Sequence, residues 1–334
     1  MPKLSDIQIR DPYVVAHDDG YYYLFGSTDP DIWKSDGVGF DVYRGVVPGN
    51  FTEFEGPFEA FRPGHDFFSH KNFWAPELHE YKGEFYLFAT FLPNASATSS
   101  CASNSEPQDP GKYFHKGDPT SEFARRGTAI LKSAEGIMGP YEPWSDGRVT
   151  PPEWETLDGT LHTDDHGTPW LVFCHEWQQI GDGTVEAVEL SGDLRATIGE
   201  PITLFSSSEA KWSAPLQGRA PGSYVTDGPF VYRNSAGVLK CLWSAFGPDG
   251  NYCIGEASSA GDIGGPWTQT DEALFAADGG HGMLFNGPKT PENPDGQRYL
   301  AVHTPNATPL ERPIFVAVAE DANGTLATTG HIIT

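Results

Sequence analysis

The sequence has few cysteines, few basic residues and no long apolar run. Four cysteines occur in 334 residues, and none lies at the Cys-x-x-Cys spacing of a structural zinc site. No stretch of 18 apolar residues occurs, so the sequence predicts no membrane-spanning helix. The N-terminal residues lack the apolar core of a secretory signal, so we expect a cytoplasmic protein, or a secreted one whose signal was removed.

Basic residues are outnumbered by acidic ones. Lys and Arg total 21 against 46 Asp and Glu, which gives a formal net charge of −25. Such a charge argues against nucleic acid, anionic membrane surfaces and polyanionic substrates as partners. A neutral sugar is compatible with it, although the charge alone does not select one.

Several common motifs are also missing. The sequence holds no Gly-x-Gly-x-x-Gly, no Gly-Lys-Ser/Thr phosphate loop and no Gly-x-Ser-x-Gly. His175-Glu176-Trp177 resembles the start of a zinc-protease helix, but the second His is absent and the preceding Leu-Val-Phe is typical of a strand. These absences exclude the usual nucleotide, serine-hydrolase and zinc-protease interpretations.

What the sequence does contain is a hairpin pattern that recurs five times. In residues 11–26 an apolar run begins with an acidic residue, passes a polar turn with Gly, and returns as an aromatic run. Four later stretches have the same form, and the first residues of the five copies lie 54 to 84 residues apart. These five residues, called the heads here, are Asp11, Trp74, Asp158, Asp227 and His281.

A repeat of this length, rich in strands and poor in helical periodicity, predicts an all-β fold with about four strands per unit. We therefore expect a five-bladed β-propeller that forms a single domain over residues 1–334, in preference to an irregular β-sandwich. Residues 133–140 and 259–266 share five of eight positions, which indicates a common outer turn in two blades. Residues 93–123 read as a long surface insertion. One of the strands expected at 312–319 and 325–334 would pair with the N-terminus and close the ring.

The heads carry the candidate chemistry. The innermost strand of each propeller blade lines the central channel, so equivalent heads gather around one axis. Asp11, Asp158 and Asp227 would then share a cavity with the Trp74 indole and the His281 imidazole. Glycoside hydrolysis needs one ionised carboxylate to activate water and one protonated carboxyl to donate to the leaving oxygen.

These residues resemble glycoside hydrolase family 43. The resemblance rests on Arg10-Asp11-Pro-Tyr, Trp74-Ala-Pro-Glu-Leu-His, Asp158 ahead of Asp164-Asp-His-Gly, Asp227-Gly-Pro and Gly280-His-Gly, in this order along nearly the whole chain. The family comprises five-bladed, inverting glycosidases, chiefly arabinofuranosidases, arabinanases and β-xylosidases. The resemblance implies that Asp11 is the general base, that Asp158 modulates the pKa of the acid, and that Asp227 holds the general-acid position.

The acid position departs from the family pattern, which is Glu-Gly-Pro. Asp is one methylene shorter, so its carboxyl would sit about 1.5 Å further back on an unchanged backbone. Inversion needs roughly 6.5–9.5 Å between the two carboxyls. Glu176 follows a strand that returns from Asp158 and is the alternative candidate for the acid.

The expected substrate-binding residues are aromatic or basic. Trp74 is the best candidate for an aromatic platform under a sugar ring, and Trp177 is a second that could equally be a core residue. Arg10 and Arg312 could bind sugar hydroxyls or orient the carboxylates, and His281 could contact substrate. The resemblance also places His281 on the propeller axis, where a calcium ion is a possibility, although no cofactor is required for the chemistry.

The combined reading is an inverting exo-glycosidase, most simply an α-L-arabinofuranosidase that acts on small arabinose-bearing oligosaccharides. The related β-xylosidases usually carry an extra C-terminal β-sandwich, which we do not expect here. Two alternatives stay open: a β-xylosidase or other exo-glycosidase of the same family, and a carbohydrate-binding propeller that has lost hydrolysis because Asp227 replaces Glu. A propeller that serves only as a protein scaffold would not need acids at three heads.

Overall fold

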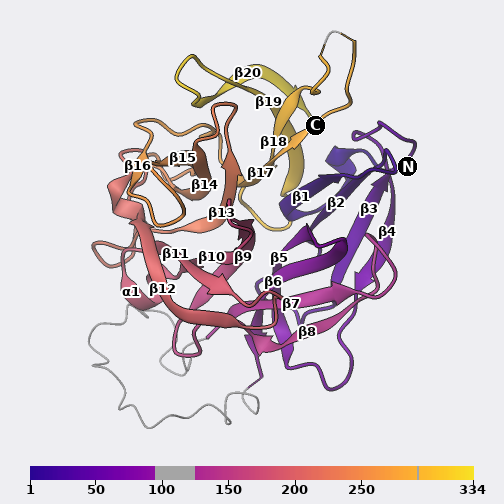
Figure 1. The fold of residues 1–334 in the computed structure, drawn as a ribbon, viewed down its shortest axis with the longest axis horizontal. Coiled ribbons are helices and arrows are strands. Elements are labelled where there is room, and N and C mark those ends of the chain that lie inside the picture. The colour runs from indigo at the N-terminus through magenta and orange to yellow at the C-terminus, as the bar shows by residue number, and fades with distance from the viewer. Residues whose placement is uncertain (95–124, 292) are drawn as a thin grey trace.

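The computed structural model, which describes residues 1–94, 125–291 and 293–334, is a ring of five antiparallel four-stranded sheets. Figure 1 looks down on this ring, and the five sheets follow one another around a common centre in chain order. The predicted all-β, five-bladed propeller is therefore confirmed. Most of the predicted insertion at 93–123 lies outside the described residues.

Each blade is built from four strands that are consecutive in the sequence. In blades 1 and 2 they are β1 Arg10–Ala16, β2 Tyr22–Ser27, β3 Phe40–Gly45 and β4 Phe54–Phe61, then β5 Ser69–Tyr81, β6 Glu84–Pro93, β7 Gly127–Ser133 and β8 Tyr141–Arg148. Blade 3 contains β9 Thr156–Thr163, β10 Pro169–His175, β11 Thr184–Leu190 and β12 Thr197–Ser206, with the short helix α1 Trp177–Ile180 after β10. Blades 4 and 5 comprise β13 Asp227–Arg233, β14 Leu239–Phe246, β15 Tyr252–Ser259 and β16 Trp267–Gln269, then β17 Gly280–Asn286, β18 Arg298–Thr304, β19 Arg312–Glu320 and β20 Leu326–Ile333.

The predicted hairpins form because polar turns join the first two strands of the blades. In blade 1 the His17 N–H donates to the Tyr21 carbonyl, and Gly20 takes a left-handed φ of 85°. In blade 4 the side-chain oxygen of Asn234 accepts the Ala236 and Val238 N–H groups, and Gly237 is left-handed at 80°. Glycine adopts this conformation without the strain that a Cβ would cause.

The predicted outer-turn repeat also occupies matching places. It joins β7 to β8 in blade 2 and β15 to β16 in blade 4. In each turn a serine hydroxyl, from Ser133 or Ser259, donates to a carbonyl three residues later. Similar sequence has therefore produced the same turn in two blades.

The ring is not closed as predicted. β20 pairs with β19 within blade 5, and Lys3 instead forms a bridge with Glu53 beside blade 1. No strand is exchanged between the ends of the described chain, because blade 5 already contains four strands. Blade 5 meets blade 1 through β1 and β17, where the Val14 N–H donates to the Met283 sulfur at 3.4 Å.

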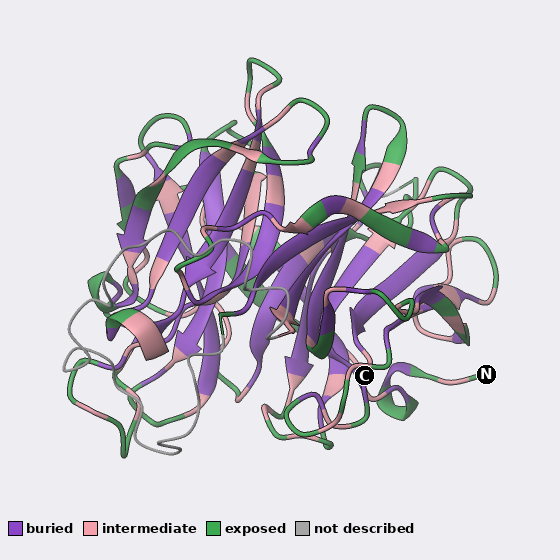
Figure 2. Ribbon diagram, turned by 90° about the horizontal axis from the view of Figure 1, so that it is seen from below, coloured by how far each residue is buried: buried purple, intermediate pink, exposed green. Residues whose placement is uncertain are grey.

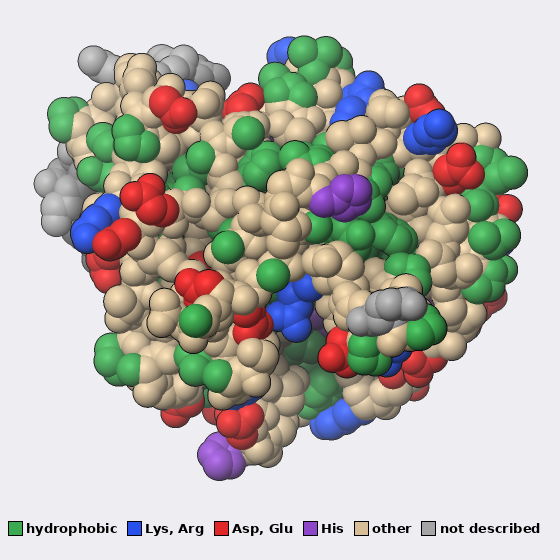
Figure 3. All heavy atoms as spheres, turned by 90° about the horizontal axis from the view of Figure 1, so that it is seen from above, with side chains coloured by type: hydrophobic (Ala, Val, Ile, Leu, Met, Phe, Trp, Pro, Cys, Tyr) green, Lys and Arg blue, Asp and Glu red, His purple; other side chains and the backbone are tan. Residues whose placement is uncertain are grey.

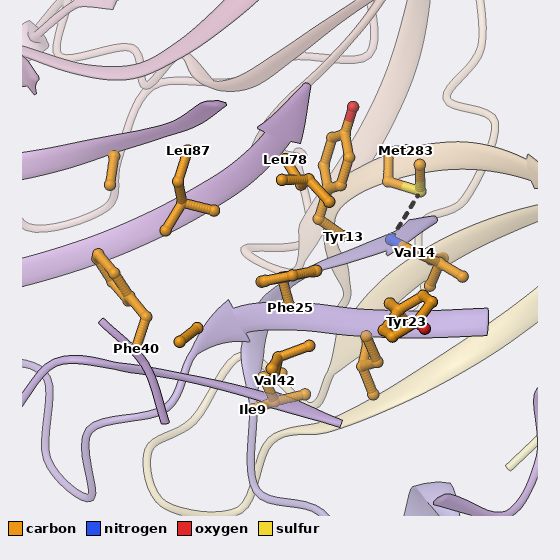
Figure 4. Packing of buried hydrophobic residues seen from close by; sticks show 14 of the residues in the cluster. Ile9, Tyr13, Val14, Tyr23, Phe25, Phe40, Val42, Leu78, Leu87 and Met283 are labelled. Atoms are coloured by element: carbon orange, nitrogen blue, oxygen red, sulfur yellow. Dashed lines mark hydrogen bonds between the residues drawn. The ribbon is translucent and has the colours of Figure 1, made fainter. Parts of the chain in front are cut away.

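Apolar side chains fill the spaces between blades. In Figure 4, residues of blades 1, 2 and 5, among them Phe25, Leu78 and Met283, point into one buried cluster. Burying a large apolar side chain contributes roughly 1.5–3 kcal/mol, so these contacts hold neighbouring blades together. Figure 2 shows that the strands are mostly buried, whereas the turns and several outer strands are exposed.

One face of the molecule carries charged and hydrophobic side chains together (Figure 3). On the face shown in Figure 3, acidic and basic side chains are interspersed. Within the described residues, no helix is long and apolar enough to cross a membrane.

Candidate active site

Every blade carries a bulge near the start of its first strand. One residue pairs with the second strand, and the next residue leaves the regular pairing. That next residue has a left-handed φ between 45° and 58° in all five blades. The five left-handed residues are Asp11, Ala75, Asp158, Gly228 and His281. A bulge redirects side chains and is frequent beside active sites.

The five heads are therefore not all equivalent. Asp11, Asp158 and His281 occupy the left-handed position, whereas Trp74 and Asp227 stand one residue earlier and pair with Thr90 and Ser244. The sequence carries a trace of this offset, because Pro12 follows Asp11 directly, whereas Pro76 and Pro229 stand two residues after Trp74 and Asp227. Asp227 consequently projects from a different backbone position than the other two aspartates.

The bulges are tied together by hydrogen bonds between neighbouring blades. The Ala75 N–H donates to the Ser27 hydroxyl at 2.7 Å, and the Asp158 N–H donates to the Thr90 hydroxyl at 2.8 Å. Two further bonds of the same kind run from His281 to Ser244 at 2.8 Å and from Asp11 to His303 at 3.2 Å. At the remaining junction the Gly228 N–H donates to the Asp158 carboxylate at 3.0 Å. We call these five contacts the bulge ring.

A cavity of about 500 Å³ lies above the bulge ring. Most of the predicted site residues line it, namely Arg10, Asp11, Trp74, Asp158, Glu176, Trp177, Asp227 and His281. The volume is in the range of small-molecule sites. The cavity thus receives side chains from all five blades.

Asp11 is held in its ionised form. Its carboxylate accepts the Ser27 hydroxyl at 2.6 Å and lies 3.1 Å from the His281 Nδ1. Burial would raise the pKa of Asp11, but the charges of His281 and Arg10 and the Ser27 hydrogen bond outweigh it, so the pKa is lowered. Burial lowers the pKa of His281, but the charges of Asp11, Asp158 and Asp227 raise it by more. The net increase favours the imidazolium.

Asp158 faces the same ring nitrogen of His281 as Asp11 does, but its pKa is shifted in the opposite direction. Its Oδ2 is 3.7 Å from the His281 Nδ1 and accepts the Gly228 N–H. Burial raises the pKa of Asp158 to about 7, His281 opposes this, and the charges of Asp227 and Asp11 add to it. Asp11 and Asp158 therefore differ in protonation although they occupy equivalent bulge positions.

Of the two candidate acids, Glu176 is buried and Asp227 is half-buried. Asp227 accepts the Tyr252 hydroxyl at 2.9 Å, and burial raises its pKa against the opposing effects of His281 and Tyr252. Glu176 is 3% exposed and follows β10, and burial raises its pKa to about 8 although Arg126 opposes the increase. Both groups are thus biased toward the protonated form that a general acid needs.

Besides Trp177, two tryptophans line the cavity, Trp74 and Trp33, and of these two only Trp74 was expected from the sequence. The Trp74 indole donates to the Ile32 carbonyl, and the Arg126 guanidinium lies 4.7 Å from its ring centre, so one platform face is already covered. Trp33 meets Trp74 edge-on at 5.0 Å and is 55% exposed at the cavity edge. Trp33 is therefore more available to a sugar ring than Trp74.

Arg10 is positioned through blade 5. Its Nη2 donates to the Asn306 Oδ1 at 2.7 Å, and the same oxygen is 3.4 Å from the His303 Nε2. Burial and the Arg10 charge lower the pKa of His303 to about 3, so this ring is neutral. Because the His303 Nδ1 accepts the Asp11 N–H, its hydrogen must be on Nε2.

Arg312 is the one predicted binding residue that the structure places away from the cavity. Its guanidinium donates to the carbonyls of Ser5, Pro309 and Glu311, and it does not line the cavity. It stabilises the junction of the N-terminal segment with blade 5. A basic residue at the start of β19 could not be told from a binding residue by sequence alone.

Sequence reasoning missed seven polar residues that line the cavity, namely Arg126, Gln178, Gln217, Arg219, Tyr252, Asn306 and Thr308. They belong to second or later strands and to connecting segments, outside the repeated heads. No repeat signal marks such positions.

The possible axial cation gains no support from the described residues. None of their His, Cys, Asp and Glu side chains form a group of three or more that could hold a metal ion. The His281 Nδ1 faces carboxylates, and its Nε2 is buried without a hydrogen-bond partner in the described part of the chain. The raised pKa of His281 favours the ring with hydrogen on both nitrogens, a form that cannot ligate a cation.

Convergent acids in an aromatic-walled cavity on the axis of a β-propeller indicate the class of the glycoside hydrolases. The sequence model described as Glycosyl hydrolases family 43 matches residues 5–317. The chain belongs to this family.

Relatives agree with this assignment. The chain is 23% identical over 251 residues to the extracellular exo-α-(1→5)-L-arabinofuranosidase ArbA of Cellvibrio japonicus, covering 73% of this chain and 60% of the relative. It is 24% identical over 284 residues to the α-L-arabinofuranosidase 43 of Humicola insolens, covering 81% of this chain and 49% of the relative. The chain therefore spans about half to three fifths of these two relatives. The solved endo-arabinase of Bacteroides thetaiotaomicron is 34% identical with a TM-score of 0.75, and the match covers 96% of this chain and 97% of that one.

Proposed function

We propose that the protein is an inverting exo-α-L-arabinofuranosidase that removes arabinose from the ends or side chains of plant-type oligosaccharides. The observation that carries the proposal is the unequal protonation of carboxyls in one cavity. The pKa of Asp11 is lowered, whereas that of Asp158 is raised to about 7 and that of Glu176 to about 8. Separate acid and base forms near neutral pH are what glycoside hydrolysis requires.

In this mechanism Asp11 is the general base. It removes a proton from a water molecule that attacks the anomeric carbon, and the glycosidic bond to the leaving oxygen breaks. Asp158 orients the site and, when charged, raises the pKa of nearby acids. Asp227 or Glu176 donates the proton to the leaving oxygen, and no cofactor takes part.

The choice of sugar is supported by the relatives. Two curated relatives are named as arabinofuranosidases, and one of them is exo-acting. The cavity of about 500 Å³ suits one or two sugar rings. A second candidate, endo-acting hydrolysis of arabinan, is favoured by the 34% identity to the solved endo-arabinase. A cytoplasmic location stays a prediction.

A substrate panel tests the proposal. Wild-type protein is incubated with p-nitrophenyl α-L-arabinofuranoside, p-nitrophenyl β-D-xylopyranoside and linear α-1,5-arabino-oligosaccharides. We expect cleavage of the arabinofuranoside and stepwise release of monomeric arabinose. Release of xylose alone would instead indicate a β-xylosidase, internal fragments would indicate endo cleavage, and sugar binding without cleavage would indicate a binding propeller.

A further inference from the structure

Glu176 is held rigidly at the cavity wall. Its N–H donates to the Glu155 carbonyl at 2.9 Å, and its own carbonyl accepts the N–H groups of Gln179 and Ile180 at the start of α1. The residue is 3% exposed and lines the cavity that contains Asp11 and Asp158. Its backbone thus fixes where the carboxyl can reach.

The two oxygens of the Glu176 carboxyl have different surroundings. Oε2 accepts the Gln178 amide at 2.9 Å and faces the Arg126 Nη2 at 3.4 Å. Oε1 accepts no hydrogen bond within the described residues. It is not fully buried, so it is open to the cavity that Glu176 lines. A protonated carboxyl with both donors on Oε2 carries its hydrogen on Oε1, where it can be donated to a ligand.

The nearby cation does not force Glu176 to ionise, because Arg126 has its own counter-ion. Glu155 accepts both the Arg126 N–H and its guanidinium, with Nε to Oε1 at 2.5 Å and the backbone N to Oε2 at 3.0 Å. Burial raises the pKa of Glu176 to about 8 although Arg126 opposes the increase, and the charge of Asp227 adds to it. Glu176 is therefore a neutral donor below that pH.

Asp227 is arranged differently. The Tyr252 hydroxyl donates to its Oδ2 at 2.9 Å, which stabilises the ionised carboxylate. His281 acts in the same direction. Asp227 also has a side chain one methylene shorter than the Glu of the family pattern. Burial still raises the pKa of Asp227 on balance, but its shorter side chain and the Tyr252 hydroxyl on its Oδ2 make it a poorer proton donor than Glu176.

We propose that Glu176, in place of Asp227, is the general acid, and that Asp227 acts by keeping Glu176 protonated. This assignment rests on the proposed hydrolysis. Water adds to the anomeric carbon, and Asp11 takes one of its protons. The bond from that carbon to the leaving oxygen breaks, and the Glu176 Oε1–H is transferred to this oxygen. Asp11 ends protonated and Glu176 ionised, and exchange with solvent restores both.

The assignment also places the leaving group. Beside Glu176 the cavity wall consists of Trp177 and Gln178, with Gln217 and Arg219 across from them. The Arg219 guanidinium lies 5.7 Å from the centre of the Trp177 ring. The departing alcohol or sugar therefore leaves on the α1 side, where Trp177 and Gln178 line the cavity.

The test compares Glu176→Gln with Asp227→Asn on two arabinofuranosides. A 2,4-dinitrophenyl leaving group departs without protonation, whereas an arabino-oligosaccharide needs a proton. We expect Glu176→Gln to lose about 10²–10⁴-fold in kcat on the oligosaccharide and to stay within about 10-fold of wild type on the dinitrophenyl glycoside. Asp227→Asn should change both substrates by a similar factor. The reverse pattern would overturn the assignment while leaving the hydrolase proposal intact.

The pH profile gives a second readout. Wild-type kcat on the oligosaccharide should fall as pH rises through the pKa of the acid, and Asp227→Asn should move this limb to lower pH because a charge that raises that pKa is gone. Glu176→Gln should lose this limb in its residual activity on the oligosaccharide. A limb that survives Glu176→Gln but vanishes in Asp227→Asn would refute the proposal. Circular dichroism and arabinose binding confirm that both variants are folded, and a wild type that cleaves neither substrate would refute the hydrolase proposal itself.

Discussion

Asp11, Asp158, Asp227 and Glu176 show how one cavity gives like groups unlike protonation. Asp11, Asp158 and Glu176 are buried and Asp227 is half-buried, and loss of solvent alone would raise each pKa. Asp11 is the exception because the His281 imidazolium, Arg10 and Ser27 all stabilise its charge. Position on the backbone does not decide this outcome, since Asp158 has the same left-handed bulge conformation.

Asp11→Asn should abolish turnover and preserve binding. The amide cannot accept a proton from water, so kcat on arabinofuranosides should fall by about 10²–10⁴-fold, the usual contribution of a general base. Titration calorimetry with an arabino-oligosaccharide should give an unchanged affinity within a few-fold. A variant with wild-type kcat would remove Asp11 from the mechanism.

Glu176→Gln should stabilise the protein at alkaline pH. In the unfolded chain Glu176 ionises near its ordinary pKa of 4.5, but in the folded protein it does so at about 8. Ionisation therefore favours unfolding as pH rises between these values, and the wild type loses stability that the glutamine variant keeps. The gap in Tm should grow from pH 4.5 to pH 8 and then level off, as measured by calorimetry, whereas a gap that is independent of pH would contradict the buried, neutral carboxyl.

The sequence predicted the aspartates of the site but not the residues that contact the site's charged groups. Asp11, Asp158 and Asp227 were found because they head repeated strands. Arg126 and Asn306 were not, because their contacts join segments far apart in the chain and depend on the closed ring. Arg312 was predicted at the cavity because its sequence position carries no information on where its guanidinium points.

At the scale of the element, the bulge ring links the fold to the chemistry. Its bonds use side chains of the second strands, among them Ser27 and Thr90, to hold the backbone N–H groups of the next blade. The pattern of apolar residues predicted the hairpins, but not the bulges, because a bulge adds one residue without altering the strands on either side. The offset of Trp74 and Asp227 is marked in the sequence only by the spacing to Pro76 and Pro229, and the structure shows that it separates paired from left-handed positions.

Thr90→Val tests the bulge ring. It removes the hydroxyl that accepts the Asp158 N–H and leaves this buried group unpaired, which costs about 1–3 kcal/mol. Chemical denaturation should show this loss, and kcat should fall because Asp158 is no longer fixed. Thr90→Ser keeps the hydroxyl and is the control. Equal stability in the two variants would show that the bond is unimportant.

At the scale of the whole molecule, repeat length and order sufficed to predict a five-bladed ring. Closure of that ring did not follow from the sequence, because the pairing of a terminal strand depends on which edge is already occupied. Blade 5 supplies its own outer strand, β20, so the N-terminal residues pair beside β4 instead.

The net charge of −25 should make stability depend on salt. Repulsion among acidic side chains opposes the compact state, and salt screens it, with a Debye length of about 30 Å at 0.01 M and about 8 Å at 0.15 M. We expect Tm to rise over this range of sodium chloride in differential scanning fluorimetry. A fall in Tm would mean that favourable ion pairs outweigh the repulsion.

The central claim is that Asp11 directs water to the face of the sugar opposite the leaving group. Proton NMR of the first minutes of p-nitrophenyl α-L-arabinofuranoside hydrolysis tests it most directly, because the anomer formed by the enzyme is seen before mutarotation. The account predicts that β-arabinose appears first. Initial release of α-arabinose would indicate retention through a covalent intermediate and would contradict the assignment of Asp11 as a general base.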